Sequence, residues 1–408
     1  MRARVRFAGA LIAAAAVAAC STPPEPIVPS ATPPAPVPSV AEGGGCRTTS
    51  DAVLSDPADG MTPADSVSAY LDAGGDPTAL AASLFDRGWI SPTSIAVWTD
   101  IDNDGDLDFS AGLTGPPDAQ GIALSGSVIL WRCQGGSYLR SEIASARPDF
   151  GLPALREAQD LTGDGTPELL VAYPLCGAHS CFAQFAVFQW DGPAMADRFK
   201  GVSDDMPYPE LSIEPGGPGA PAAIKVTATG IGSVGAGPYR IWSRTWRWEA
   251  AAQSFLSGEP VVEAPRYRIH ALYDADDAFA NGDTSTALSL YLRVIEDDSL
   301  LDWQTTGERR SELAAYAAYR RVLAFLMSGD EAGAQAEIDL RLEGLSGPAN
   351  AYAELARLLF AADPARSLPE ACTDVRRYVE QNSQAILDPL DHGYANRTYL
   401  AADICPMS

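Results

Sequence analysis

The chain has 408 residues, with 53 acidic and 28 basic side chains and a formal net charge of −25. This excess of acid argues against binding to nucleic acid and against direct attraction to anionic lipid headgroups. It suits an exported protein that binds cations, and the length suits two domains or one elongated domain.

The first 19 residues have the pattern of an export signal. Three arginines open the chain, an apolar run covers residues 7–17, and two alanines precede Cys20. The run is too short for a membrane-spanning helix. The segment resembles a bacterial lipoprotein signal, which implies lipidation at Cys20 and an anchored, extracytoplasmic place in the bacterial cell envelope. The alternative is an ordinary secreted protein in which Cys20 has no such role.

Residues 20–45 are rich in Pro, Ala and Ser and poor in large apolar side chains. Such a segment cannot bury a core, so we expect an extended tether. Residues 46–88 are expected to form a short helical cap. In this cap Gly74-Gly75 ends one helix and Asp76-Pro77 begins another.

Two acidic loops follow, with the sequences DIDNDGDLD over residues 100–108 and DLTGDGTPE over residues 160–168. Both carry side-chain oxygens at loop positions one, three, five and nine, and glycine at position six. Alternate residues can point oxygens inward, and the glycine permits the sharp turn that returns the ninth residue. The pattern predicts two sites for calcium as a structural cofactor. The alternative is a turn of Asp and Gly residues without an ion.

The expected ligands differ between the two loops. In the first loop they are Asp100, Asp102, Asp104 and Asp108 through their side chains, and Asp106 through its backbone carbonyl. In the second loop they are Asp160, Asp164 and Glu168 through carboxylates, Thr162 through its hydroxyl or a water, and Thr166 through its carbonyl. Fewer carboxylates predict weaker affinity in the second loop. Magnesium fits less well, because it requires octahedral geometry and keeps its water.

The loops belong to a longer repeat. They start 60 residues apart (160 − 100), and Trp131, Trp190 and Trp248 stand 59 and 58 residues apart (190 − 131 and 248 − 190). This period predicts a third unit, whose loop near residue 215 keeps Gly and Pro but has lost its carboxylates apart from Glu214. Residues 89–263 are therefore expected to form a β-repeat domain of three units.

Residues 264–408 have a helical pattern. Leu, Phe and Tyr recur every three or four residues, with small residues between them. Asn281-Gly282-Asp283 and Ser328-Gly329-Asp330 separate members of helix pairs. The predicted fold class is thus α+β with several domains, in which a β-repeat precedes an array of helical hairpins.

The acidic loops resemble FG-GAP and related integrin-alpha-type repeats at Asp100, Asp102, Asp104 and Asp108 and at Asp160, Thr162, Asp164 and Glu168. The resemblance implies calcium-binding loops between strands of propeller-like blades. Three units are fewer than a usual closed propeller has, so we expect an open array. An EF-hand fits less well, because Ala111 and Val171 occupy the position where its loop needs Glu.

The helical part resembles tetratricopeptide repeats at Phe279, Gly282, Ala287 and Tyr291. That resemblance implies a groove that binds a peptide or a partner protein. The alternative is a plain helical bundle packed on the β domain.

Six cysteines remain when Cys20 is set aside. An even number in an exported chain indicates disulfides, although six cysteines allow fifteen pairings. The pairs we expect, from closeness in the sequence and then by elimination, are Cys176 with Cys181, Cys372 with Cys405, and Cys46 with Cys133. The alternative for the closest pair is a zinc site with His179.

The sequence shows little sign of catalysis. It lacks a phosphate-binding Gly-Lys-Ser/Thr loop, a His-Glu-x-x-His helix and a Gly-x-Ser-x-Gly elbow. We therefore expect a non-enzymatic, lipid-anchored binding or scaffolding protein, with calcium-stabilised β-repeats and a helical surface for a protein partner. Two alternatives remain, a carbohydrate-binding or hydrolytic surface protein and a purely structural envelope lipoprotein.

Overall fold

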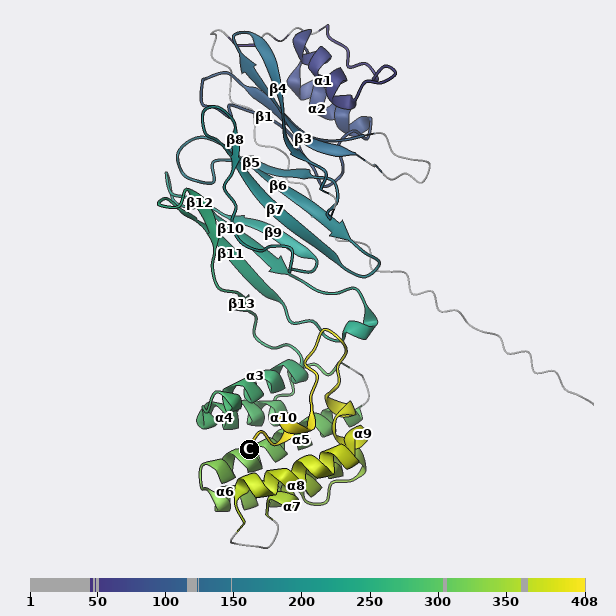
Figure 1. Ribbon diagram of the computed structural model, residues 1–408, viewed down its shortest axis with the longest axis vertical. Helices are drawn as coiled ribbons and strands as arrows, with labels where there is room; N and C mark the ends of the chain where they lie inside the picture. Colours follow the sequence, from purple (N-terminus) through teal and green to yellow (C-terminus); the bar gives the residue numbers. More distant parts are fainter. Residues whose placement is uncertain are drawn as a thin grey trace, which may run out of the picture. The chain divides into compact units, whose positions relative to one another are not determined.

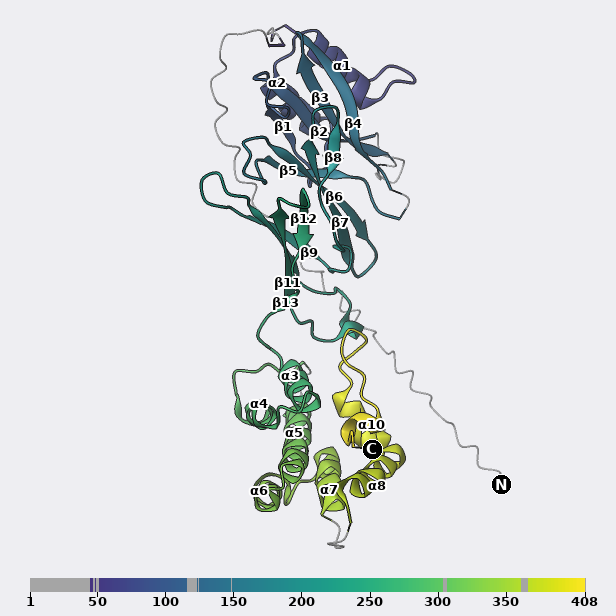
Figure 2. The ribbon, with the colours of Figure 1, turned by 60° about the vertical axis from the view of Figure 1, so that its left-hand side comes forward.

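The computed structural model describes residues 45, 46, 48, 51–115, 123, 125–147, 149–303, 307–360 and 366–407. The predicted signal segment, the predicted lipidation site Cys20 and the tether up to residue 44 lie outside the described residues. The described chain is α+β, with three antiparallel sheets followed by a helical region (Figures 1 and 2).

Two short helices precede the sheets. They are α1 (Pro63–Asp72) and α2 (Pro77–Asp86). The first begins with a capping box in which Thr62 and Asp65 satisfy each other's backbone N–H groups, and Asp76 caps the second by accepting from the N–H of Thr78. The two helices expected within residues 46–88 are present.

In each sheet, strands that are consecutive in sequence pair as a meander, except that the last strand of the third sheet, β13, pairs with β11. The first contains β1 (Ala96–Thr99), β2 (Asp108–Thr114), β3 (Gly126–Gln134) and β4 (Ser137–Ser145). The second contains β5 (Ala154–Gln159), β6 (Glu168–Cys176), β7 (Cys181–Trp190) and β8 (Met195–Asp197). The third contains β9 (Pro209–Glu214), β10 (Ala223–Ala228), β11 (Trp242–Glu249), β12 (Ser254–Ser257) and β13 (Val261–Val262).

The three sheets correspond to the three predicted repeat units. In the first two sheets the acidic loop joins the first strand to the second, as β1 to β2 and β5 to β6. The segment over residues 215–222, which has lost the carboxylates, occupies the same place between β9 and β10. The strand order therefore repeats even where the cation ligands do not.

The tryptophan period, however, is not the structural period. At the start of the second strand, Phe109 pairs with Trp131, Leu169 with Phe188, and Ile224 with Trp246. The equivalent residues on the third strands are therefore Trp131, Phe188 and Trp246, spaced by 57 and 58 residues (188 − 131 and 246 − 188). Trp190 and Trp248 lie two residues further along their strands, where side chains return to the same face.

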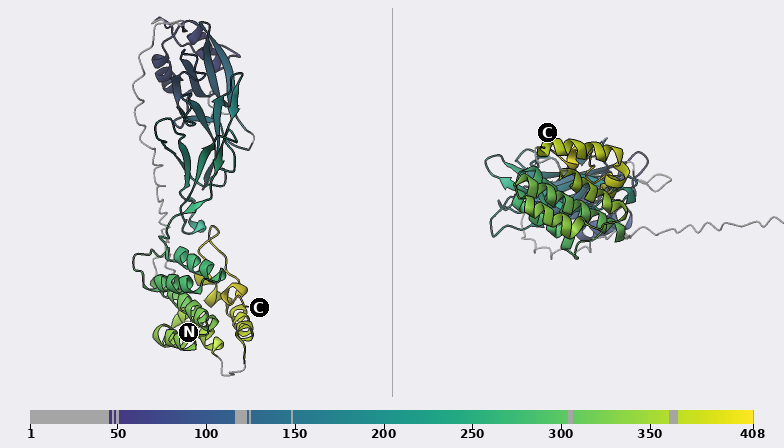
Figure 3. Two further views of the ribbon diagram at one scale, coloured as in Figure 1. Left: turned by 90° about the vertical axis from the view of Figure 1, so that its left-hand side faces the viewer. Right: turned by 90° about the horizontal axis from the view of Figure 1, so that it is seen from below.

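The sheets pack on one another in chain order through their alternating faces. Phe109 and Trp131 of the first sheet pack with α1 and α2, whereas Leu130 faces the second sheet and contacts the core that contains Leu169. On the opposite face of β6, Leu170 packs against the third sheet. Because both faces of β6 are covered, its first six residues are all buried. Figure 3 shows the sheets and the helical region from two further sides.

The helical region begins directly after the third sheet. Its longer helices are α3 (Arg268–Ala280), α4 (Thr284–Glu296), α5 (Gly307–Met327), α6 (Glu331–Glu337), α7 (Asn350–Leu359) and α8 (Leu368–Gln381). Its shorter helical elements are η2 (Ile338–Leu342), η3 (Gly347–Ala349), α9 (Ser383–Ile386), η4 (Asp388–Leu390) and α10 (Ala401–Ile404). A further short helix, η1 (Val234–Ala236), lies earlier, between β10 and β11. The expected breaks contain Gly282 and Gly329, whose φ angles are 78° and 77°.

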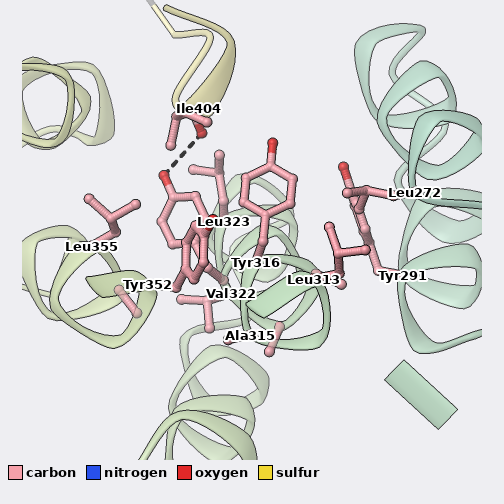
Figure 4. Close-up of a cluster of buried hydrophobic side chains, with 14 of the residues drawn as sticks. Leu272, Tyr291, Leu313, Ala315, Tyr316, Val322, Leu323, Tyr352, Leu355 and Ile404 are labelled. Atoms are coloured by element: carbon pink, nitrogen blue, oxygen red, sulfur yellow. Dashed lines mark hydrogen bonds between the residues drawn. The ribbon is translucent and has the colours of Figure 1, made fainter. Parts of the chain in front are cut away.

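Tyrosines are prominent in the core of this region. Tyr316 of α5 lies against Tyr352 of α7, with ring centroids 5.6 Å apart. The hydroxyl of Tyr319 donates to the carbonyl of Ile404 at 3.1 Å, which ties the last helix to α5 (Figure 4). The C-terminal segment is thus part of the core.

All three predicted disulfides are present, as Cys46–Cys133, Cys176–Cys181 and Cys372–Cys405. The zinc alternative is wrong, because Cys176 and Cys181 are bonded to each other. Disulfides indicate an oxidising compartment outside the cytoplasm. In the described part of the chain, no helix combines the length and the apolar character needed to cross a membrane.

Candidate metal centre

The two acidic loops share an unusual backbone. Loop positions four and six have left-handed φ angles in both, at 59° for Asn103 and 94° for Gly105 in the first loop, and at 80° for Gly163 and 90° for Gly165 in the second. Glycine and asparagine tolerate this conformation better than other residues. The sequence pattern therefore reflects a real turn geometry.

Aspartates at positions one and five hold each turn by accepting hydrogen bonds from backbone N–H groups of the loop. Asp100 accepts hydrogen bonds from the backbone N–H groups of Asp104 at 3.2 Å and Gly105 at 2.9 Å. In the second loop, Asp160 accepts from Gly163 at 2.6 Å and Gly165 at 2.9 Å. At position five, the carboxylates of both loops accept from the N–H two residues later, at 2.9 Å and 2.8 Å.

The carboxylate at position nine fastens the end of each loop to its beginning. Asp108 accepts from the N–H of Ile101 at 2.9 Å, and Glu168 accepts from the N–H of Leu161 at 2.7 Å. Both acids are fully buried. The second oxygen of Asp108 accepts from the N–H of Cys133 on β3 at 2.7 Å, so the first loop is also tied to its sheet.

Three acids of the first loop converge. One oxygen from each of Asp100, Asp102 and Asp108 lies within 4.8 Å of the others. Two oxygens bound to one calcium ion, each at about 2.3–2.6 Å, are separated by at most about 5 Å. Among the residues that the structure describes, these three make the one such group of acids, histidines or cysteines, and they can hold a metal ion.

Asp102 has an unsatisfied oxygen. Its side chain is 5% exposed, and its Oδ2 accepts from Nη1 of Arg132 at 2.8 Å. Its Oδ1 is buried and has no hydrogen-bond partner in the described structure. Leaving such an oxygen bare costs about 1–3 kcal/mol or more, so a buried carboxylate oxygen normally has a partner.

Burial disfavours the charged forms of the neighbouring acids. It raises the pKa of Asp108 to about 7, despite the lowering effect of the N–H groups of Ile101 and Cys133. It also raises the pKa of Asp104, to which the charges of Asp102, Asp106 and Asp100 add. A divalent cation reverses this tendency, because it favours ionised carboxylates around it.

The second loop satisfies its own acids. The hydroxyl of Thr162 donates to Glu168 at 3.0 Å, and Gln189 donates from Nε2 to Asp164 at 3.1 Å. Burial raises the pKa of Glu168 to about 7. Asp160, Asp164 and Glu168 do not form a converging group like that of the first loop. The hydrogen bonds therefore hold this loop together without requiring an ion.

Not all predicted ligands of the first loop gather at its centre. Asp104 is exposed and lies outside the group of three, although its hydrogen bond fixes the turn. Asp106 lies beside the start of the described chain, where a Cβ atom on Gly45 would approach its Oδ1 to 2.9 Å. The carbonyl groups of Asp106 and Thr166 remain predicted ligands.

Two contacts of the site were not predicted from the sequence. Arg132 stands directly after the buried Trp131 and reaches the acidic loop, while its guanidinium lies 4.7 Å from the ring centre of Trp190. Gln189 follows the equivalent Phe188 and reaches the second loop. In both sheets, the residue that contacts the acidic loop directly follows the buried aromatic residue of the third strand. The sequence shows this pattern only when Phe188, and not Trp190, is aligned with Trp131.

No family model, curated protein or solved structure matches this chain.

Proposed function

We propose that this is a lipid-anchored, extracytoplasmic binding or scaffolding protein, whose β-repeat region is stabilised by calcium at the first acidic loop. Two observations carry the calcium assignment: Oδ1 of Asp102 is buried without a hydrogen-bond partner, and the carboxylate of Asp102 offers an oxygen within 4.8 Å of oxygens of Asp100 and Asp108. Arg132 donates a hydrogen bond only to the other oxygen of Asp102, Oδ2. A calcium ion would satisfy the bare oxygen and offset the repulsion among the three carboxylates.

The ion's role is structural in this proposal. It would hold the end of β1 to the start of β2, and through Asp108 and Cys133 also to β3. The proposal assigns no nucleophile or general base to the site. The second loop, held by its own hydrogen bonds, would bind calcium more weakly.

Calcium removal provides the test. We expect a chelator to lower the thermal midpoint and added calcium to restore it, because a ligand that binds only the folded state stabilises it, by about 2.7 kcal/mol at 100 times its Kd. Asp102→Asn should lose most of this calcium-dependent shift. Differential scanning calorimetry with and without chelator measures both effects.

Asp160→Asn is the matched control, since it changes the second loop at position one and should leave most of the shift intact. If the wild-type midpoint does not respond to chelator and elemental analysis finds no bound metal, the calcium assignment is wrong.

The anchor is proposed from the lipoprotein-like signal and from the three disulfides, which fit export. Cys20→Ser should move the protein from the membrane fraction to the soluble fraction of fractionated cells, because one thioether-linked lipid attachment is lost. Cys176→Ser should remain in the membrane fraction. Equal partitioning of Cys20→Ser and the wild type would contradict the anchor.

The helical region is the proposed partner surface. Its helix pairs, α3 with α4 and α5 with α6, are separated at Gly282 and Gly329, where the tetratricopeptide resemblance expects breaks.

A further inference from the structure

A cavity of about 240 Å³ opens where the third sheet meets α3. Segments from the end of β10, the approach to β11 and the connection into α3 form its walls, with a tryptophan that follows α4. The side chains used below are Tyr239, Arg240, Arg266, Tyr267, His270 and Trp303. This volume is below the usual range of about 300–1,000 Å³ for small-molecule sites, so it suits a ligand of monosaccharide size.

Arg240 forms a fixed part of the wall. Its guanidinium makes two hydrogen bonds to the carboxylate of Asp274, and its Nε donates to the carbonyl of Glu263 at 3.0 Å. Nearby, the hydroxyl of Tyr239 accepts from Nε1 of Trp242 at 2.7 Å, which leaves its own proton available. These bonds hold the polar groups in place before any ligand arrives.

His270 is fixed from behind by Asn396. The imidazole is 3% exposed, and its Nε2 lies 3.2 Å from Oδ1 of Asn396. Nδ2 of Asn396 donates to the carbonyls of Ala236, Pro238 and His392 at 2.9–3.1 Å. One amide side chain therefore joins the C-terminal segment, the loop before β11 and a wall of the cavity.

Two groups in the cavity wall can form further hydrogen bonds. Arg266 is exposed, and its guanidinium has no ion pair or hydrogen bond with a residue that the structure describes. The indole N–H of Trp303 likewise has no acceptor within the described residues. The Trp303 ring packs edge-on against Tyr267, with centroids 5.8 Å apart, and Tyr267 packs edge-on against His270 at the same distance.

We propose that this cavity binds one carboxylate-bearing sugar unit, with its acid on Arg266 and its ring against the aromatic wall of Tyr267 and Trp303. Arginine pairs with a carboxylate through charge-assisted hydrogen bonds. The hydroxyl of Tyr239 and the indole N–H of Trp303 suit a ligand with several hydroxyl groups. Arg240 is already paired with Asp274, and Glu263 also lines the cavity, so Arg266 is the group that favours an anion there.

The charges in a neighbouring cavity predict the orientation of the ligand. It is also lined by Trp303, but it carries Asp388 and Asp391 in place of the arginines. A carboxylate is therefore favoured on the side of Arg266 and disfavoured on the other. This inference goes beyond the proposed function, since it assigns a small-molecule site far in sequence from the calcium loop.

Titration of the intact, calcium-loaded protein with free sugars tests the proposal. Calorimetry should detect binding of glucuronic acid, with at least about tenfold weaker binding of neutral glucose, as expected for loss of one charge-assisted contact. Arg266→Gln should remove this preference, and Trp303→Ala should weaken binding of both sugars. Arg247→Gln, which removes another exposed arginine of the same region, should behave as the wild type.

The outcomes separate this site from the calcium loop. The proposal would be overturned if Arg266→Gln left the binding of glucuronic acid unchanged. It would also be overturned if a protein with a normal calcium-dependent midpoint bound neither sugar. Benzoate binding more tightly than glucuronic acid would overturn the assignment to a sugar. An unaltered calcium shift in Arg266→Gln confirms that the variant is folded.

Discussion

Replacing Asp276 by Asn is expected to lower the free energy of unfolding by about 3–5 kcal/mol, because the change leaves a buried arginine without its counter-charge. Asp276 on α3 is 5% exposed and Arg320 on α5 is 3% exposed. Nε of Arg320 lies 3.2 Å from Oδ1 of Asp276. Chemical denaturation of the variant and the wild type measures the difference.

The surroundings of this pair explain the size of the effect. The hydroxyls of Tyr291 and Tyr399 each donate to one oxygen of Asp276 at 2.5 Å. Burial raises the pKa of Tyr291 well above its usual value, so it remains a neutral donor. Arg320 also donates to the carbonyls of Asp403 and Ile404 at 2.9 Å and 3.2 Å. The network therefore joins α3, α4, α5 and the C-terminal segment.

The adjacent residue supplies a control. Asp277 pairs with Arg397 at 2.6 Å, but the two side chains are 58% and 38% exposed. Asp277→Asn should cost less than about 1 kcal/mol, as exposed ion pairs usually do. In a double-mutant cycle, the Asp276→Asn/Arg320→Met variant should lose less free energy of unfolding than the sum of the losses in the two single variants. Equal losses for Asp276→Asn and Asp277→Asn would contradict the predicted role of the buried pair.

The helices, strands and turns could be predicted from the sequence because each depends on residues that are close together in the chain. Gly282 and Gly329 end helices through left-handed turns, and Gly135 and Gly136, with φ angles of 60° and 83°, make the tight turn between β3 and β4. The stacking of the sheets was harder to predict. Leu169 and Leu170 face different neighbouring sheets, and adjacent apolar residues do not say what covers each face.

The site shows the same division between local and distant contacts. The turn and the places of Asp100 and Asp108 follow from spacing within one loop. The position of Asp104 outside the group of three acids does not follow from that spacing. The hydrogen-bond partner of Asp102 is Arg132, which is 30 residues away. In the second loop, Gln189 lies 25 residues from Asp164, and its bond decides how that carboxylate is satisfied. Spacing identifies candidate ligands, but it does not show which of them are already occupied.

Replacing both Cys46 and Cys133 by Ser is expected to lower the free energy of unfolding by about 4–5 kcal/mol and also to weaken calcium binding. The bridge spans 87 residues of sequence, and a loop of that length gives a large entropic stabilisation. The corresponding change at Cys176 and Cys181, which are 5 residues apart, should cost about 2 kcal/mol. Thermal and chemical unfolding in saturating chelator compares the two.

The effect on calcium follows from the position of this bridge. The N–H of Cys133 donates to Asp108 at 2.7 Å, and the N–H of Cys46 lies 2.9 Å from the sulfur of Cys133. Gly45, the first described residue, adjoins Asp106 of the same loop. Without the bridge, Cys133 and the start of the chain no longer hold the loop from outside, so ordering it on calcium binding costs more.

Isothermal titration with calcium distinguishes a local effect from general loss of stability. The Cys46→Ser/Cys133→Ser variant should bind calcium more weakly than the wild type at a temperature where both are folded, whereas Cys176→Ser/Cys181→Ser should match the wild type. Such a result would mean that the Cys46–Cys133 bridge and the calcium site stabilise each other. Unchanged calcium affinity in both variants would mean that the loop is organised by its own hydrogen bonds alone.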